Sequence, residues 1–249
     1  MLSNQGARRR TWFSNKVVTG FRSNDTVALT FDDGPDSQFT PRVLEILKRH
    51  GARATFFTIG RQAELYPYIL RQIEDAGCEV ANHSYSHPSF SLLSVFKRVA
   101  ELLHCERAIG KSGQMYFRPP FGHASNNTPF WASLLNYTTV CWSVDVKDWE
   151  IKDPDTILDL LTMNVRPGAI VLLHDRVETA TDASFYDREA MLTALDKFLD
   201  KHKSSIKFKM LSEVFSACEV ILADWDKSLS KDQRRLRQRE FLALKRNAP

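Results

Sequence analysis

Two adjacent carboxylates, Asp32 and Asp33, stand at the end of an apolar run and are followed at once by Gly34 and Pro35. An apolar run that ends in turn residues predicts a buried strand that leads into a loop. Neighbouring side chains of a strand point to opposite faces, so both carboxylates can serve one pocket only where the strand breaks. Glycine and proline supply that break, and buried carboxylates without partners are costly. The pair therefore indicates metal binding, acid–base chemistry or both.

Two histidines, His83 and His87, follow a later apolar run at a spacing of four residues. This spacing stacks two imidazoles on one face of a helix or helix-like turn, as a shared metal ion requires. Surface or core histidines explain such a spacing about as often as a metal site does, but the nearby carboxylate pair favours the metal. Two histidines and one carboxylate leave coordination positions open for water and substrate, which is typical of a catalytic metal.

Three further polar groups, Arg118, Asp148 and His174, each lie at the end of a predicted strand or soon after it. Taken singly, each has a structural explanation: a surface arginine on a rigid loop, a capping aspartate beside Trp149, and a structural histidine at a strand end. The hypothesis of a catalytic site rests on five chemical elements that arrive in order, each at a strand end. In a barrel these ends converge on one face, where barrel enzymes keep their active sites.

Short β-rich runs alternate with amphipathic segments over most of the chain. The predicted strands are Thr26–Phe31, Ala54–Ile59, Glu79–Asn82, Met115–Arg118, Thr138–Val144, Ala169–His174 and Ile206–Met210. The predicted helices are Thr40–His50, Gln62–Ala76, Phe90–Gly110, Thr128–Leu135, Thr156–Asn164 and Arg188–His202. This alternation predicts parallel strands with helices outside. Seven units fit a distorted (β/α)7 barrel, an open doubly wound sheet is the competing architecture, and the convergence of polar residues favours the barrel.

Composition bounds the class of protein. The 249 residues are 43% hydrophobic with sixteen phenylalanines, enough for one large core. Four widely spaced cysteines form no Cys-x-x-Cys pair, so neither a zinc knot nor a redox pair is expected. Residues 227–249 carry eight lysines and arginines against two acids, whereas the rest of the chain is slightly acidic. The basic excess is therefore confined to the end of the chain, and no nucleic-acid partner is expected.

The ordered motifs TFDDGP, HSYSH, RPPFG, DVKDW and LLH resemble those of the polysaccharide deacetylase family, the NodB-homology domains of carbohydrate esterase family 4. The similarity spans Thr26 to Phe215. The resemblance implies that Asp32 is the general base and that Asp33, His83 and His87 bind a divalent metal, zinc in most members, with cobalt or another divalent ion as an alternative. It also implies the family's distorted (β/α)7 barrel.

The remaining roles are also carried over from the resemblance. Arg118 would keep Asp32 ionised and oriented, and the backbone N–H of Phe121 would help stabilise the oxyanion. His174 would be the general acid, with Asp148 tuning it. Trp149 and Leu172 would line the acetyl pocket. The family's usual tyrosine is phenylalanine at position 121, which costs little because the donor is a backbone amide.

The expected activity is metal-dependent removal of N-acetyl groups from N-acetylglucosamine units of peptidoglycan, a chitin oligosaccharide or a carrier-linked sugar. The same motifs are compatible with an O-acetyl esterase that acts on acetylated xylan. A non-catalytic glycan-binding protein is the third alternative, and the complete set of proton-transfer residues argues against it.

Three regions are expected: an N-terminal extension (1–25), a catalytic domain (26–218) and a basic helical tail (219–249). The tail is interpreted as a solvated helix, with contact to a polyanion or a membrane surface as the functional alternative. No apolar stretch follows Arg8–Arg10, so no signal peptide or membrane span is expected. The sequence thus predicts a cytoplasmic location if the N-terminus is native, and a secreted or cell-envelope location if a leader has been removed.

Overall fold

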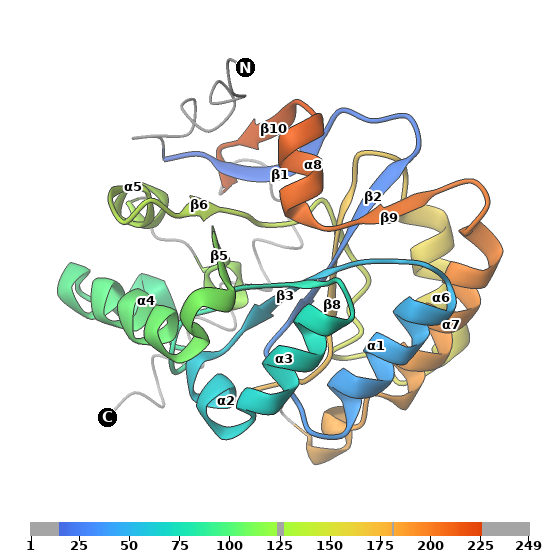
Figure 1. Cartoon of the computed structure of the whole chain (residues 1–249), viewed down its shortest axis with the longest axis horizontal. Coiled ribbons are helices and arrows are strands. Elements are labelled where there is room, and N and C mark those ends of the chain that lie inside the picture. The colour runs from blue at the N-terminus through green and yellow to red at the C-terminus, as the bar shows by residue number, and fades with distance from the viewer. Residues whose placement is uncertain (1–14, 124–126, 181, 226–249) are drawn as a thin grey trace.

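A curled parallel sheet with helices on its outer face forms the body of the molecule (Figure 1). The computed structural model describes residues 15–123, 127–180 and 182–225. The strands of the sheet are β2 (Thr26–Asp32), β3 (Thr55–Thr58), β4 (Glu79–Asn82), β5 (Gly113–Phe117), β6 (Thr138–Thr139), β7 (Val144–Asp145), β8 (Ile170–His174) and β9 (Lys207–Lys209). Their order is β6-β5-β4-β3-β2-β8-β7, and β9 also pairs with β2. The distorted α/β barrel expected from the sequence is confirmed. The predicted strand Ile206–Met210 forms β9, and the sheet has eight strands because the predicted strand Thr138–Val144 forms both β6 and β7.

The two faces of the sheet pack against two different hydrophobic cores. On β2, Val27, Leu29 and Phe31 belong to the large core that packs against the outer helices. The alternate residue Ala28 joins a second core inside the curl, together with Phe57 and other apolar side chains. Because side chains alternate along a strand, Thr30 and Asp32 share the inner face with Ala28. The site residues on this strand therefore project into the barrel.

The helices are α1 (Phe39–Arg49), α2 (Gly60–Leu65), α3 (Pro67–Asp75), α4 (Val95–Ile109), α5 (Thr128–Leu134), α6 (Pro154–Asn164), α7 (Glu189–His202) and α8 (Leu211–Ala217). One predicted helix, Gln62–Ala76, is wrong as a single element because Pro67 begins a new helix and forces Tyr66 out of helical conformation. Another, Phe90–Gly110, begins later than expected, at Val95, after a short 3-10 turn.

The single strand predicted over Thr138–Val144 is also wrong. The chain forms β6 at one edge of the sheet and β7 at the other, and residues 140–143 cross the gap between them. The carbonyls of Val140 and Cys141 accept hydrogen bonds from the buried Arg118 side chain. These two carbonyls therefore accept hydrogen bonds from a side chain inside the barrel and not from a neighbouring strand of the sheet.

A two-stranded ribbon lies at this gap. β1 (Val17–Phe21) pairs antiparallel with β10 (Val220–Ala223), and single bridges join Val18 to Val140 and Gly20 to Ala169. The prediction that residues 219–249 form a helical tail is wrong at its start, because Val220–Ala223 forms β10 by pairing with β1 near the other end of the chain. Both strands lie outside the span 26–218, whose limits as a domain stay predictions. The predicted basic helix falls outside the described residues, apart from its first few positions.

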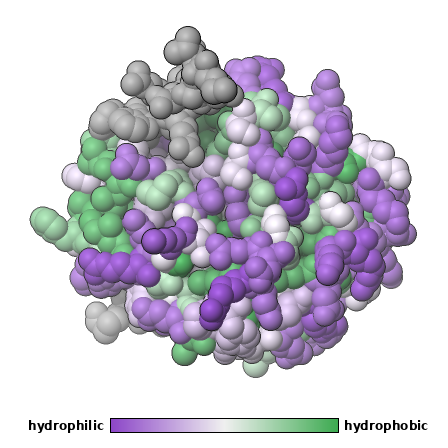
Figure 2. Space-filling view, viewed as in Figure 1, coloured by the Kyte–Doolittle hydropathy of each residue, from purple (hydrophilic) through white to green (hydrophobic). Residues whose placement is uncertain are grey.

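None of the helices within the described ranges is long and apolar enough to cross a bilayer. Figure 2 shows polar residues over much of one face, with apolar residues gathered toward the edge where α4 and α5 lie. Exposed apolar side chains on these two helices include Phe96 and Leu134.

Helix α6 offers a matched test of the outer core. Leu161 is fully buried between the sheet and the helices, whereas Met163 on the same helix is 70% exposed. We expect Leu161→Ala to lower the free energy of unfolding by about 2–5 kcal/mol, because it leaves a cavity. Met163→Ala should change it by less than about 0.5 kcal/mol. Urea unfolding of both variants measures the difference, and equal losses would contradict this packing.

Candidate metal and catalytic site

The chemical residues predicted from the sequence meet at the carboxyl ends of the strands. Asp32 ends β2 and His174 ends β8, and the two are direct partners in the parallel register. His83 directly follows β4, and Arg118 directly follows β5. Asp148 lies in the connection between β7 and α6 and reaches His174. The barrel therefore brings together residues that are more than a hundred positions apart in the sequence.

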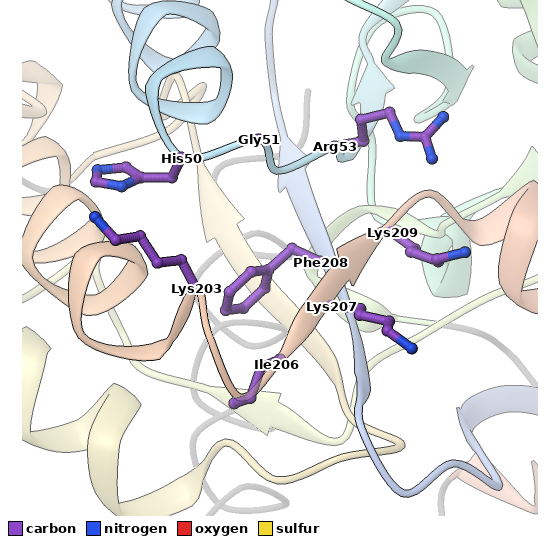
Figure 3. A pocket seen from close by; sticks show the side chains of 8 residues that line it. All are labelled: His50, Gly51, Arg53, Lys203, Ile206, Lys207, Phe208 and Lys209. Atoms are coloured by element: carbon purple, nitrogen blue, oxygen red, sulfur yellow. The ribbon is translucent and has the colours of Figure 1, made fainter.

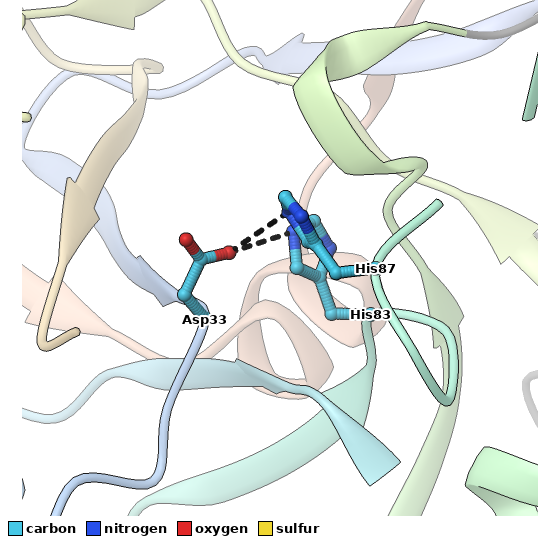
Figure 4. A group of neighbouring side chains, drawn as sticks. All are labelled: Asp33, His83 and His87. Atoms are coloured by element: carbon cyan, nitrogen blue, oxygen red, sulfur yellow. Dashed lines mark ion pairs between the residues drawn. The ribbon is translucent and has the colours of Figure 1, made fainter. Parts of the chain in front are cut away.

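One carboxylate and two imidazoles converge in a buried group (Figure 4). Asp33 Oδ1 lies 3.3 Å from His83 Nε2 and 3.1 Å from His87 Nε2. The three potential ligand atoms all lie within 4.8 Å of one another. Asp32 stands beside this group, with its Oδ2 3.7 Å from His83 Nε2. Among the described residues, Asp33, His83 and His87 are therefore the set that can hold a metal ion.

The local backbone that presents this group is irregular. Asp33 has φ 74° and His87 has φ 59°, both in the left-handed region that most non-glycine residues avoid. The histidines therefore do not lie on a helical turn, and the expected helix-like stacking is wrong. Their loop is held instead by Glu101 on α4, whose Oε2 accepts hydrogen bonds from the backbone N–H groups of Tyr85 and Ser86.

The hydrogen bonds around this group fit a cation. His83 Nδ1 donates to the carbonyl of Arg118 at 2.8 Å, so a neutral His83 presents the lone pair of Nε2 to Asp33. Asp33 Oδ1 is fully buried and makes no hydrogen bond. A lone pair that faces a carboxylate oxygen is repulsive unless a proton or a cation lies between them. The carboxylate oxygen of Asp33 and the ring nitrogens of His83 and His87 are suitable ligands for one divalent metal ion.

The protonation states agree with this assignment. Burial raises the pKa of Asp33, but the nearby rings of His87 and His83 outweigh it and hold the pKa well below its usual range. Burial lowers the pKa of His87, and the charge of Asp33 offsets this only in part. An ionised carboxylate and a neutral imidazole are the forms that bind metal.

Asp33 has a second anchor that the sequence did not reveal. Its other oxygen, Oδ2, accepts a hydrogen bond of 2.8 Å from the backbone N–H of Glu178, in the segment after β8. The Glu178 side chain is in turn paired with Arg61 and Arg176. A backbone donor leaves no residue-type signal, so only the fold shows that this segment orients the carboxylate.

Asp32 is held by a buried arginine. Arg118 is fully buried, and its Nη1 donates to Asp32 Oδ1 at 2.6 Å and to Thr30 Oγ1 at 2.8 Å. The guanidinium also lies 4.0 Å above the centre of the Phe57 ring. Because one carboxylate oxygen is taken by the arginine, Oδ2 is the one that faces the metal group. This geometry fixes the direction of the second oxygen of Asp32.

His174 is paired with Asp148 through its Nδ1, at 2.9 Å. Burial alone lowers the pKa of His174, but the Asp148 carboxylate outweighs it and raises the pKa to about 9. A residue missed by the sequence analysis, Arg188, is also buried and pairs with Asp148 Oδ2. Arg188 also donates to the carbonyls of Asp148 and His174. No residue pattern marks it, because its partners lie in segments distant along the chain.

The three residues expected to contact substrate lie around this centre. Phe121 belongs to the turn after β5, and its ring centroid lies 4.6 Å from that of His87. Leu172 is buried in β8, two residues before His174 and on the same strand face. Trp149 is half-buried next to Asp148. Their roles toward an acetyl group stay predictions.

A hollow of about 210 Å³ lies away from this centre (Figure 3). It is lined in part by Arg53, Lys203 and Lys207. The β9 residues that line it pair with the start of β2, at the opposite end of the strand from Asp32. These three cations pair with Glu213, Asp200 and Asp25, and Lys209, which also lines the hollow, shares Glu213 with Arg53. The hollow therefore lies at the opposite end of the barrel from Asp32 and His174 and is not part of the candidate metal and catalytic site.

Known proteins share this fold and sequence. A family model described as polysaccharide deacetylase matches residues 20–140. The chain is 35% identical over 193 residues to a peptidoglycan-N-acetylglucosamine deacetylase of Bacillus cereus, an alignment that covers 76% of this chain and 68% of the relative. It is 40% identical over 171 residues to a chitooligosaccharide deacetylase of Sinorhizobium fredii, which covers 66% of this chain and 80% of that protein.

A solved structure gives the same result. The crystal structure of a peptidoglycan N-acetylglucosamine deacetylase in complex with a naphthalenyl N-oxidanyl-benzamide superposes with a TM-score of 0.71 at 33% identity. The superposition covers 78% of this chain and 90% of that one. The sequence match and the structural match thus cover 76% and 78% of this chain.

The adjacent carboxylates allow a matched test of metal binding. We expect Asp33→Asn to weaken zinc binding by more than about 100-fold, since even changes behind the ligands cost roughly 10–100-fold. Asparagine tolerates the left-handed backbone at this position, so the loop should keep its shape. Asp32→Asn, one residue away, should bind zinc with an affinity close to that of the wild type. Competition with a chromophoric chelator measures both, and equal losses would contradict the assignment.

Proposed function

The chain belongs to the polysaccharide deacetylase family, and on that premise we propose that it removes N-acetyl groups from N-acetylglucosamine units of a glycan by metal-dependent hydrolysis. One observation carries the proposal: a buried Asp-His-His group lies directly beside a carboxylate and an imidazole that are neighbours in the sheet register. Hydrolysis of an amide needs an activated water, a base and an acid at one carbon, and this arrangement supplies the positions for all three.

A divalent cation held by Asp33, His83 and His87 would polarise the acetyl carbonyl and lower the pKa of a bound water. Asp32 receives the proton of the attacking water through the oxygen that Arg118 leaves unoccupied. The hydrogen bond from the arginine fixes the direction of this carboxylate. Zinc is the expected metal, because one carboxylate and two imidazoles with open positions are typical of catalytic zinc sites.

His174 protonates the leaving amine. The amine departs only after its nitrogen receives a proton, so an acid separate from Asp32 is needed. With a pKa of about 9, His174 carries that proton throughout the neutral range. Asp148 and Arg188 hold the ring so that Nε2 is the atom available to substrate.

The backbone N–H of Phe121 donates to the acetyl oxygen as negative charge develops on it. Removing one such preorganised donor lowers kcat by about 10²–10³-fold. The Phe121 ring lies against His87, so this N–H belongs to a turn that borders the metal group. Peptidoglycan and chitin oligosaccharides are the proposed substrates, because relatives with 35% and 40% identity are named for them.

Acetate release tests the proposal directly. We expect the purified protein to release acetate from N-acetylglucosamine oligomers or peptidoglycan fragments, to lose this activity to a chelator and to regain it with zinc or cobalt. Asp32→Asn and His174→Gln should each lower kcat by at least about 100-fold, whereas Asp200→Asn, on the exposed face of α7, should leave it unchanged. Faster release from acetylxylan would favour the O-acetyl esterase, and no release from any acetylated glycan would refute the proposal.

The stability of the fold should depend on pH because His174 is paired with Asp148. The folded protein raises the pKa of His174 to about 9, so protonation of His174 stabilises the fold below its ordinary pKa of about 6.5 and this contribution is lost as pH rises through about 9. We expect NMR titration of the metal-free protein to show this value. Asp148→Asn should lower it, because the charge that raises it is gone, and an unchanged pKa would contradict the account.

A further inference from the structure

The turn after β5 contains two consecutive residues in left-handed conformation. Phe121 has φ 58° and ψ 10°, and Gly122 has φ 60°. Glycine adopts this conformation freely, whereas a bulky aromatic residue rarely does. Such a residue persists there only where the surrounding structure holds it, and strained residues of this kind cluster at functional sites. The contacts that hold this turn therefore determine where its polar groups point.

The N–H groups of this turn are almost all used. The prolines at 119 and 120 have none, and those of Gly122 and His123 each donate to a proline carbonyl at 2.9 Å. Within the residues that the structure describes, no acceptor lies against the N–H of Phe121. Because the Phe121 ring packs on His87, this unused donor belongs to a turn beside the metal group. It is the one backbone donor of the turn available to a ligand.

Trp225, the last of the described residues, is hydrogen-bonded to this turn. Trp225 follows β10 and is only 5% exposed. Its indole Nε1–H donates to the carbonyl of Gly122 at 2.9 Å. A buried tryptophan N–H needs such a partner, and the carbonyl it meets belongs to the residue directly after Phe121.

The same tryptophan is connected to the other end of this segment. The rings of Trp225 and Trp142 meet edge to face, with centroids 5.0 Å apart and planes at 76°. The guanidinium of Arg118 in turn lies 5.6 Å from the Trp142 ring. Arg118 and Gly122, four residues apart, are thus both supported by one aromatic pair, and the two tryptophans lie at the gap between β6 and β7.

We propose that Trp225 is a positioning residue for the reaction: by fixing the Gly122 carbonyl it aims the Phe121 N–H at the acetyl oxygen. This inference rests on the proposed function, because it requires Phe121 to act as a donor during hydrolysis. It also extends the catalytic unit past Cys218, where the sequence predicts that unit to end. The ribbon of β1 and β10 gains a role in this way, since it carries Trp225 to the turn.

Trp225→Phe tests the proposal, because it keeps an aromatic ring and removes the N–H. We expect kcat to fall about tenfold, part of the roughly 10²–10³ that loss of a whole oxyanion donor costs. KM should stay within about twofold and zinc affinity should be unchanged, because the substitution alters no residue expected to contact substrate and no metal ligand. The control is Trp131→Phe on α5, a half-buried tryptophan away from the turn, which should leave kcat unchanged.

Hydrogen exchange gives a readout that needs no substrate. The amides of Gly122 and His123 should exchange faster in Trp225→Phe than in the wild type, while those of residues 83–87 should not change. If the wild type releases no acetate, the proposed function fails and exchange alone tests the anchor. Unchanged exchange would then overturn the inference, as would an unchanged kcat in an active enzyme. If Trp225→Phe does not fold, 3-benzothienylalanine at position 225 preserves the bulk without the N–H, and the same outcomes apply.

Discussion

A fully buried guanidinium must have its N–H groups satisfied, and much of this structure is arranged around that requirement at Arg118. Its side chain donates to Asp32, Thr30 and the carbonyls of Val140 and Cys141. The last two carbonyls are available only because the chain leaves the sheet between β6 and β7. The gap in the barrel and the orientation of Asp32, the candidate base, are therefore linked through the hydrogen bonds of Arg118.

The same residue also links the two halves of the site. The backbone carbonyl of Arg118 accepts from His83 Nδ1, which directs Nε2 toward Asp33. Its side chain meanwhile binds Oδ1 of Asp32, so that Oδ2 faces the ligand set. Asp32 lies in the last position of β2, whereas Asp33 turns into left-handed conformation at φ 74°. This break in the strand lets two neighbouring carboxylates face one pocket with different partners, one toward a cation and the other toward an arginine.

Features governed by local sequence could be predicted well. The carboxylates at the end of β2 lie where the pattern indicates. The strand predicted over Glu79–Asn82 is also confirmed, as β4. What could not be predicted depends on contacts between distant segments: the split of residues 138–144, the strand β10, and the pairing of Arg188 with Asp148. A single residue type carries no signal of a partner that only folding brings near.

The central claim is that Asp33, His83 and His87 hold the metal while Asp32, paired with Arg118, remains outside the ligand set. The most direct measurement is a crystal structure of the zinc-loaded protein with anomalous diffraction at the zinc edge. The account predicts one zinc peak about 2.0–2.2 Å from an Asp33 oxygen and from Nε2 of both histidines. It also predicts that Asp32 stays bound to Arg118. Zinc ligated by Asp32, or bound without His83 and His87, would contradict it.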